Sequence, residues 1–228
     1  MSQPNPAKRA AAFAAADLVP TGATIGLGSG STFAFVLERL AERMQKDGFT
    51  VRGVPSSIAT ADIAKRLGVP LVSLDEVERL DLTIDGADEV DPRKNLIKGG
   101  GGAHVRERIV AEAAKEMIVV IDEQKLVDVL GKAFLLPVEV LPFGWMQTAR
   151  AIAATGCTTK RREGADQKPY VTDNGNWILD CKYAGIDDPA LLDAQLGGLT
   201  GVVDHGLFVG IAGRIVVGNA DGKVRILP

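Results

Sequence analysis

The sequence predicts an α/β protein with a doubly wound parallel sheet and a second, smaller α+β domain. Up to Gly131, short apolar runs alternate with segments of helical periodicity, which is the pattern of a parallel sheet. After Gly131 the alternation gives way to short strand-like runs separated by turn signals. The 228 residues are 46% hydrophobic, which is enough for a buried core.

The first domain is expected to alternate helices with buried strands. An amphipathic helix at 6–18 precedes a strand at 23–28, and a helix at 31–47 completes the first β-α unit. The same pattern then recurs three times: a strand at 51–54 with a helix at 57–67, a strand at 80–85 with a long loop and a helix at 103–116, and a strand at 117–122 with a short helix.

The second domain is expected to contain antiparallel strands and two helices. The expected elements are a strand at 137–142, a helix near 147–155, a strand at 158–162, a hairpin through 171–180 and a helix near 189–199. A last hairpin at 214–227 is expected to return to the first domain. The expected domains are therefore residues 1–131 plus 206–228, and residues 132–205, the latter as the candidate oligomer interface.

Charge and cysteine content narrow the function classes. A formal net charge of −3 argues against nucleic-acid binding, and the basic run Lys160–Arg162 is expected to be a solvated face. No run has the roughly 20 apolar residues of a membrane helix, and the alanine-rich start lacks signal-peptide features. The two cysteines, Cys157 and Cys181, form no disulfide framework and are expected to be core thiols. The expected location is the cytoplasm.

Four loops that follow the parallel strands carry unusual residues, and ligands bind at this edge of such sheets. They are GSGST (28–32), PSS (55–57), DGADEVD (85–91) and DEQK (122–125). In the first loop, the glycines let the backbone approach an anion closely. Ser29, Ser31 and Thr32 supply hydroxyls, and the N-terminus of the next helix favours negative charge. Phosphate is the expected ligand, with an ordinary helix cap as the alternative, because neither the dinucleotide fingerprint nor the P-loop pattern fits.

The acidic loop at 85–91 holds four carboxylates and has three interpretations. It could bind Mg²⁺ or Ca²⁺, but the spacing matches no EF-hand loop and the nearby Arg93, Lys94 and Lys98 would compete with a cation. It could be a solvated acidic loop. Because Asp85 directly follows an apolar strand, its carboxylate could instead handle the proton of a sugar hydroxyl.

The segment KGGGGAHVRE at 98–107 combines a lysine, four glycines and an acid. Four consecutive glycines are entropically costly and are best explained where backbone N–H groups surround a ligand. Glu107 lies in an early turn of the expected helix, where acids are also common for electrostatic reasons. His104 adjoins the glycines, His205 is expected to be structural, and no third ligand completes a metal triad.

Together these motifs resemble the ribose-5-phosphate isomerase family of the A type. The resemblance rests on GLGSGST, the serine pair at 56–57, DGADEVD, KGGGGAHVRE and DEQKLVDVLGK, and it extends to LPVEVLP and VTDNGNWILD in the smaller domain. It implies a Rossmann-like domain, a ferredoxin-like smaller domain and a homodimer or homotetramer. It also implies interconversion of ribose 5-phosphate and ribulose 5-phosphate in the non-oxidative pentose phosphate pathway, without metal or cofactor.

The resemblance assigns roles to particular residues. It implies that Glu107 is the base and that Asp85, Asp88 and Lys98 act at the sugar. The implied substrate-binding set is Ser29, Gly30, Ser31, Thr32, Asp85, Gly86, Ala87, Asp88, Lys98, Gly99, Gly100, Gly101 and Lys125. The chemistry agrees, since one carboxylate can carry a proton from C2 to C1 through an enediolate while a lysine and N–H groups stabilise its oxygens. A second acid must open the sugar ring, and Asp85 is expected in this role with Asp88 as support.

Two other classes of function compete with this interpretation. Related sugar-phosphate folds occur as effector domains of transcription regulators, but the residues before the first strand are too few for a helix-turn-helix. Another sugar-phosphate isomerase or an acyl-CoA transferase of similar architecture is the enzymatic alternative. Formation of a ketose from ribose 5-phosphate would separate them.

Overall fold

The computed structural model describes residues 5–228, which divide into two compact units. The first unit contains the chain up to Ala87, residues 106–125 and residues 211–228. The second contains residues 88–105 and 126–210. The expected limits differ from this division, because they placed 88–105, 126–131 and 206–210 in the first domain. In the structure the strand at 96–97 pairs with the strands at 89–90 and 207–208, and 126–131 forms bridges to Val90 and Ile186.

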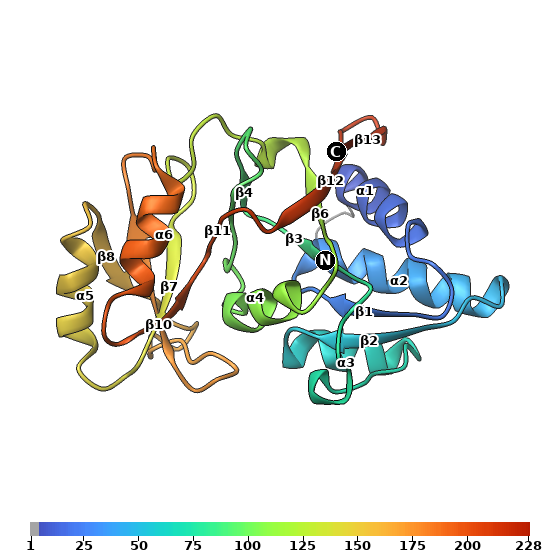
Figure 1. The fold of residues 1–228 in the computed structure, drawn as a ribbon, viewed down its shortest axis with the longest axis horizontal. Coiled ribbons are helices and arrows are strands. Elements are labelled where there is room, and N and C mark those ends of the chain that lie inside the picture. The colour runs from blue at the N-terminus through green and yellow to red at the C-terminus, as the bar shows by residue number, and fades with distance from the viewer. Residues whose placement is uncertain (1–4) are drawn as a thin grey trace. The chain divides into compact units, whose positions relative to one another are not determined.

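The first unit is built on a six-stranded sheet in the order β13-β12-β6-β3-β1-β2 (Figure 1). Its strands are β1 (Ala23–Leu27), β2 (Val51–Pro55), β3 (Leu82–Gly86), β6 (Met117–Asp122), β12 (Ala212–Gly218) and β13 (Val224–Leu227). All neighbouring pairs are parallel except β12 and β13, which form the expected C-terminal hairpin. This confirms the parallel sheet that the alternating pattern predicted and the Rossmann-like arrangement that the family resemblance implied.

Helices cover both faces of this sheet. They are α1 (Pro6–Asp17), α2 (Ser31–Lys46), α3 (Ile58–Arg66) and α4 (His104–Glu112), with short 3-10 turns at Leu74–Glu76 and Glu123–Lys125. The alanines of α1 and the apolar stripe of α2 bury together against the sheet in one core cluster. On the other side, Val110 of α4 packs with Val54 and Leu80 in a smaller cluster. The apolar periodicity of the sequence is thus satisfied on both faces.

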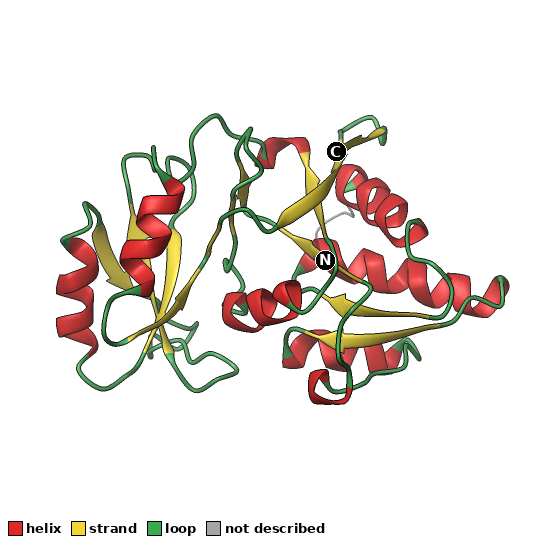
Figure 2. Ribbon diagram, in the orientation of Figure 1, coloured by secondary structure: helices red, strands yellow, loops and turns green. Residues whose placement is uncertain are grey.

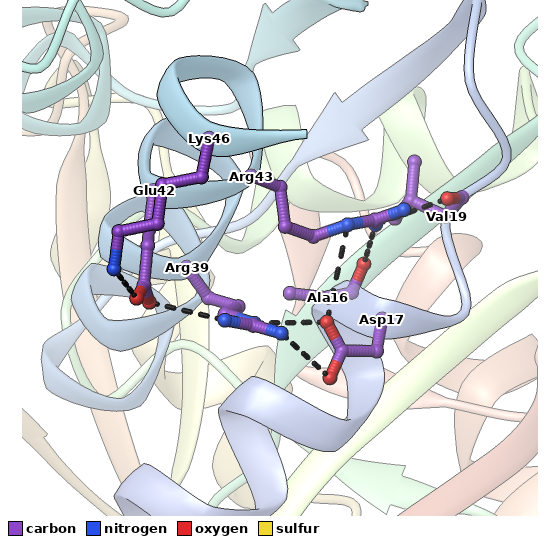
Figure 3. A network of polar contacts seen from close by, with 7 residues as sticks. All are labelled: Ala16, Asp17, Val19, Arg39, Glu42, Arg43 and Lys46. Carbon is purple, nitrogen blue, oxygen red and sulfur yellow. Dashed lines mark hydrogen bonds and ion pairs between the residues drawn. The ribbon is translucent and has the colours of Figure 1, made fainter. Parts of the chain in front are cut away.

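Polar contacts fasten α2 to the end of α1 (Figure 3). Arg39 Nε donates to Asp17 Oδ1 at 2.9 Å, and Arg43 Nη1 donates to the carbonyl oxygens of Ala16 at 2.6 Å and Val19 at 3.1 Å. Ala16 lies in the last turn of α1, and Val19 lies two residues beyond its end. Arg43 gives both carbonyls a charged donor and places a favourable charge at the C-terminal end of the helix dipole.

The second unit contains a four-stranded antiparallel sheet in the order β10-β7-β9-β8, with two helices (Figure 2). Its elements are β7 (Leu136–Val140), α5 (Trp145–Ala153), β8 (Thr158–Arg161), β9 (Trp177–Lys182), α6 (Pro189–Gly197) and β10 (Val202–His205). The chain order βαββαβ with this strand order is the ferredoxin-like arrangement. A three-stranded sheet of β4 (Glu89–Val90), β5 (Leu96–Ile97) and β11 (Leu207–Phe208) completes the unit.

One helix ends earlier than its sequence pattern predicts. The expected helix at 103–116 stops at Glu112. Beyond it, Leu80 N–H donates to the Ala113 carbonyl and Lys115 N–H donates to the Leu80 carbonyl, at 2.9 and 3.0 Å. These contacts to another segment replace the helical hydrogen bonds and lead the chain into β6. None of the helices within residues 5–228 is long and apolar enough to cross a membrane.

Candidate functional site

The strand order places the first loop and the acidic loop at a switch point. The chain leaves β1 toward β2 on one side, while β3 lies on the other side of β1, and ligands of open parallel sheets bind at such a reversal. Gly28 and Ser29 follow the carboxyl end of β1, and Asp85 lies at the same end of β3. Two motifs that are far apart in the sequence are therefore adjacent within the first unit.

Asp85 is the residue that connects these loops. Its Oδ1 accepts hydrogen bonds from the N–H groups of Ser29, at 3.0 Å, and Gly86, at 2.7 Å. The side chain is buried, with 3% of the residue exposed. A Cβ at Gly28 would lie 2.2 Å from Asp85 Oδ1, so only glycine fits there. The glycine thus makes room for the carboxylate as well as for a ligand.

A group of hydroxyls holds the Ser29 side chain. Its Oγ lies 2.9 Å from the Oγ atoms of both Ser56 and Ser57, and Ser57 donates to Thr60 Oγ1 at 2.9 Å. Thr60 in turn donates to the Gly28 carbonyl at 2.8 Å. Ser56 and Ser57 were not among the expected site residues. Their position after the second parallel strand was the signal that could have identified them.

The rest of the first loop opens helix α2. Gly30 has φ 90°, a backbone conformation that glycine adopts at little cost, and Ser31 and Thr32 begin the helix. No side chain caps this N-terminus. The 16-residue helix therefore directs its first N–H groups and the positive end of its dipole outward from the loop. This arrangement suits a phosphate group.

Glu107 lies in the first turn of α4 and is buried, with 7% of the residue exposed. Close packing of α4 against β1 sets its position. A Cβ at Gly26 would lie 2.3 Å from Val110 Cγ1, so the glycine in β1 lets the helix approach the sheet. The helix dipole favours a carboxylate in this turn.

Lys98 follows β5 in the second unit and is buried, with 3% of the residue exposed. Its N–H donates to the Gly206 carbonyl at 2.8 Å, and its Nζ lies 5.6 Å from the centre of the Phe208 ring. A Cβ at Gly206 would lie 2.0 Å from the Lys98 carbonyl oxygen. Gly206, which directly precedes the strand at 207–208, thus fixes the backbone of Lys98 by a hydrogen bond and by close packing.

The glycine loop, residues 99–102, follows directly. Gly99 and Gly102 have φ of 92° and 79°, and the Gly102 N–H donates to the Gly99 carbonyl at 2.9 Å. Asp88 Oδ2 accepts from the Gly100 N–H at 2.9 Å. A Cβ at Gly99 would lie 2.6 Å from Nδ1 of the buried His104. The bends of this loop therefore require glycine for conformation and for space.

The expectation of a solvated face at Lys160–Arg162 is wrong for Arg162. Only 15% of its side chain is exposed, and its guanidinium binds the Asp180 carboxylate through both Nε and Nη2. Sequence position could not reveal this, because Arg162 follows directly after β8 and its partner Asp180 lies on β9, 18 residues further along the chain.

The expected site residues thus fall into two sets. The first unit holds Ser29, Gly30, Ser31, Thr32, Asp85, Gly86, Ala87, Glu107 and Lys125, and the second holds Asp88, Lys98, Gly99, Gly100 and Gly101. Lys125 ends the short 3-10 turn after β6, at the same sheet edge as Asp85. His205 is buried, and its Nδ1 accepts from the Leu207 N–H at 3.3 Å. Across residues 5–228, no group of three or more His, Cys, Asp or Glu side chains is arranged to hold a metal ion.

A protein-family comparison matches residues 52–222 to the family described as ribose 5-phosphate isomerase A (phosphoriboisomerase A). The chain is 50% identical over 220 residues to ribose-5-phosphate isomerase A of Chloroflexus aurantiacus, covering 96% of this chain and 92% of that protein. It is 51% identical to the protein of the same name from Rhodopseudomonas palustris, covering 94% of each.

Solved structures agree with the sequence comparisons. Ribose 5-phosphate isomerase A of Methanocaldococcus jannaschii superimposes with a TM-score of 0.92 at 39% identity, covering 96% of this chain and 97% of that one. A D-ribose-5-phosphate isomerase solved in complex with phospho-erythronic acid gives a TM-score of 0.93 at 37% identity, covering 96% of each chain.

Proposed function

The chain belongs to the ribose 5-phosphate isomerase A family, and from that premise we propose how its residues interconvert ribose 5-phosphate and ribulose 5-phosphate. The observation that carries the proposal is that three ionisable side chains of the sequence motifs are buried. They are Asp85, Lys98 and Glu107. Charged side chains are rarely buried without a functional or structural reason. Their chemistry matches the needs of an aldose-ketose isomerisation.

Glu107 is the base of the reaction. It removes the proton from C2 of the open-chain aldose and returns a proton to C1, so that the carbonyl moves from C1 to C2 through an enediolate. Lys98 and N–H groups of the glycine loop stabilise the negative charge on the enediolate oxygens. Because these groups supply both acid-base function and charge stabilisation, we expect turnover to persist after exhaustive chelation with EDTA.

Asp85 and Asp88 serve the ring-opening step. Ribose 5-phosphate is largely cyclic, so a carboxylate must exchange protons with the anomeric hydroxyl and the ring oxygen. Asp85 is held by two N–H donors beside the first loop and takes this role. Asp88 supports it, while its Oδ2 also accepts from the Gly100 N–H.

The loop at 29–32 and Lys125 bind the phosphate. The N-terminus of α2 provides N–H donors, and the hydroxyls around Ser29 provide O–H donors. Lys125, at the same edge of the sheet, provides positive charge. Ribose without phosphate should therefore be a very poor substrate, since remote binding energy positions the reacting carbons. Similar kcat/KM values for ribose and ribose 5-phosphate would contradict this assignment.

An isotope experiment tests the whole proposal. Pure protein is incubated with ribose 5-phosphate in D₂O, and the ketose is analysed by NMR. A proton carried by one carboxylate exchanges partly with solvent, so deuterium should appear at C1 of ribulose 5-phosphate. Absence of ketose would reject the activity, whereas complete C2-to-C1 hydrogen transfer in a reaction that requires a metal ion would reject the enediolate route.

We also propose that the enzyme is cytoplasmic and a homodimer or homotetramer. Both cysteines are free, as expected in a reducing compartment. Large apolar side chains are exposed in the second unit near the start of α5, with Phe143 95%, Met146 54% and Leu141 49% exposed. Such a group of side chains favours self-association of this unit. The mass in solution, measured by light scattering, tests the oligomer, and a monomer would reject it.

A further inference from the structure

Side chains from the segment that joins β8 to β9 hold three consecutive carbonyl groups of the glycine loop. Arg162 Nη1 donates to the oxygens of Gly99 at 3.1 Å and Gly100 at 3.0 Å. The Tyr170 hydroxyl donates to the oxygen of Gly101 at 3.0 Å. All five residues belong to the second unit. The loop is thus fixed by partners that lie more than sixty residues further along the chain.

These two side chains are themselves held in place. The Asp180 carboxylate binds the Arg162 guanidinium in a bidentate ion pair, which fixes its plane. Tyr170 N–H donates to the Arg162 carbonyl at 3.0 Å, and a Cβ at Gly102 would lie 2.6 Å from the Tyr170 ring. Burial raises the pKa of the Tyr170 hydroxyl, so it stays protonated and can donate to Gly101.

Holding the carbonyls determines where the N–H groups point. The peptide bonds are trans, so each carbonyl is opposed by the N–H of the next residue. The N–H groups of Gly100 and Gly101 therefore point away from Arg162, and the N–H of Gly102 points away from Tyr170. Asp88 accepts the first and the Gly99 carbonyl accepts the third. Within residues 5–228, the Gly101 N–H has no protein acceptor.

We propose that Arg162 and Tyr170 are positioning residues, which orient the glycine loop so that the Gly101 N–H donates to an oxygen of the enediolate. The inference rests on the proposed function. A donor that is already oriented costs no reorganisation as charge develops, which is the basis of oxyanion stabilisation. Arg162 and Tyr170 thus act by orienting the backbone of the glycine loop, and neither is a catalytic residue.

The test compares Tyr170→Phe and Arg162→Met with the control Arg161→Met. Arg161 is the last residue of β8 and directly precedes Arg162, but its guanidinium packs over Trp145 and Trp177, 5.1 and 5.2 Å from the ring centres. Phospho-erythronic acid serves as the probe, because its carboxylate stands in for the enediolate oxygens. Measured quantities are kcat, KM, the inhibition constant of the probe and amide hydrogen exchange of residues 99–102.

Tyr170→Phe should lower kcat by about 3- to 10-fold, the range expected for one hydrogen bond. Arg162→Met should lower it by about 100-fold, as expected when reacting groups are misplaced. In both, KM should stay within about twofold while inhibition by the probe weakens by the same factor as kcat. Arg161→Met should match wild type in all of these and in exchange of the loop amides.

Two results would overturn the inference. One is wild-type kcat in folded Tyr170→Phe and Arg162→Met enzymes, and the other is a loss confined to KM. If Arg162→Met fails to fold, Tyr170→Phe decides alone. If the wild-type protein forms no ketose, the proposed function fails. Amide hydrogen exchange of residues 99–102 then tests whether the two side chains orient the loop. Faster exchange at 99–102 in Tyr170→Phe than in Arg161→Met then supports it, and equal exchange rejects it.

Discussion

The two loops that present backbone N–H groups are stabilised in different ways. The loop at 28–32 is held by residues at the ends of neighbouring parallel strands, namely Asp85 and the serine pair at 56–57. The glycine loop at 99–102 is held by Arg162 and Tyr170, which lie in the segment between β8 and β9 of the same unit. The first loop is therefore shaped by sheet order, and the second by side chains that only a folded antiparallel sheet brings to it.

This comparison teaches that similar glycine-rich sequences can depend on different parts of a protein. A change in the parallel sheet should disturb the first loop. A change on the strand at 158–161 or the segment that follows should disturb the second. Variants that alter the base alone, the first loop alone or the glycine loop alone can test this difference in support.

The largest effect is expected for Glu107→Gln, which changes neither loop. The amide keeps the size of the side chain but cannot accept the C2 proton, so kcat should fall by about 10²- to 10⁴-fold with little change in substrate affinity. Steady-state kinetics and binding of phospho-erythronic acid measure the two quantities. Glu112→Gln, at the exposed end of the same helix, is the matched control. Near-normal turnover in Glu107→Gln would mean that another group is the base.

Gly28→Ala should damage the first loop. The new Cβ would lie 2.2 Å from the Asp85 carboxylate and 2.6 Å from the Ile84 carbonyl oxygen, and the backbone cannot move away easily. We expect kcat/KM to fall by about 100-fold, as for a small misplacement of reacting groups. Gly197→Ala, where a Cβ meets nothing within 4 Å, controls for the substitution itself. Equal kinetics in both variants would show that Asp85 does not fix this loop.

Gly100→Ala should damage the glycine loop less. Its Cβ would lie 2.9 Å from the end of the Phe134 ring and 3.0 Å from the Asp88 carboxylate oxygens, which are side-chain atoms that can shift. We expect a loss of about tenfold in kcat, the value of roughly one hydrogen bond. Stopped assays at saturating ribose 5-phosphate would measure it. A larger loss than in Gly28→Ala would reverse the order that these contacts imply.

The smallest effect concerns a thiol of the second unit that does not touch the glycine loop. The neighbouring Cys181 thiol, aided by the Tyr183 and Thr155 hydroxyls, lowers the pKa of Cys157 to about 7. Alkylation of Cys157 by iodoacetamide, followed by mass spectrometry, should therefore show a midpoint near that pH, with little effect on kcat. Cys181→Ala should move the midpoint upward. A midpoint that does not respond would exclude the Cys181 thiol as the cause.

Much of the site could be predicted because its motifs follow strands. Asp85, Ser29 and Gly30 come directly after buried apolar runs, and the carboxyl ends of parallel strands share one edge of a sheet. Hydrophobic periodicity alone predicted the buried strands and the helices that cover them. The limits of the units could not be predicted, since the short strands at 89–90 and 96–97 carry too few residues to show a period.

The sequence by itself determined the element types, the parallel sheet of the first unit and the antiparallel strands of the second. Its motifs also carried the family resemblance, which implied the Rossmann-like and ferredoxin-like arrangements and the residues expected to act on the sugar. These depend on local patterns of apolar residues, glycines and acids, which are visible in a linear chain. Only the tertiary structure decided that Ser56 and Ser57 support Ser29, that α4 ends at Glu112, and that Arg162 forms an ion pair with Asp180. Each of these depends on a partner distant in sequence, because hydrogen bonds and ion pairs are fixed by spatial proximity and no single segment encodes it.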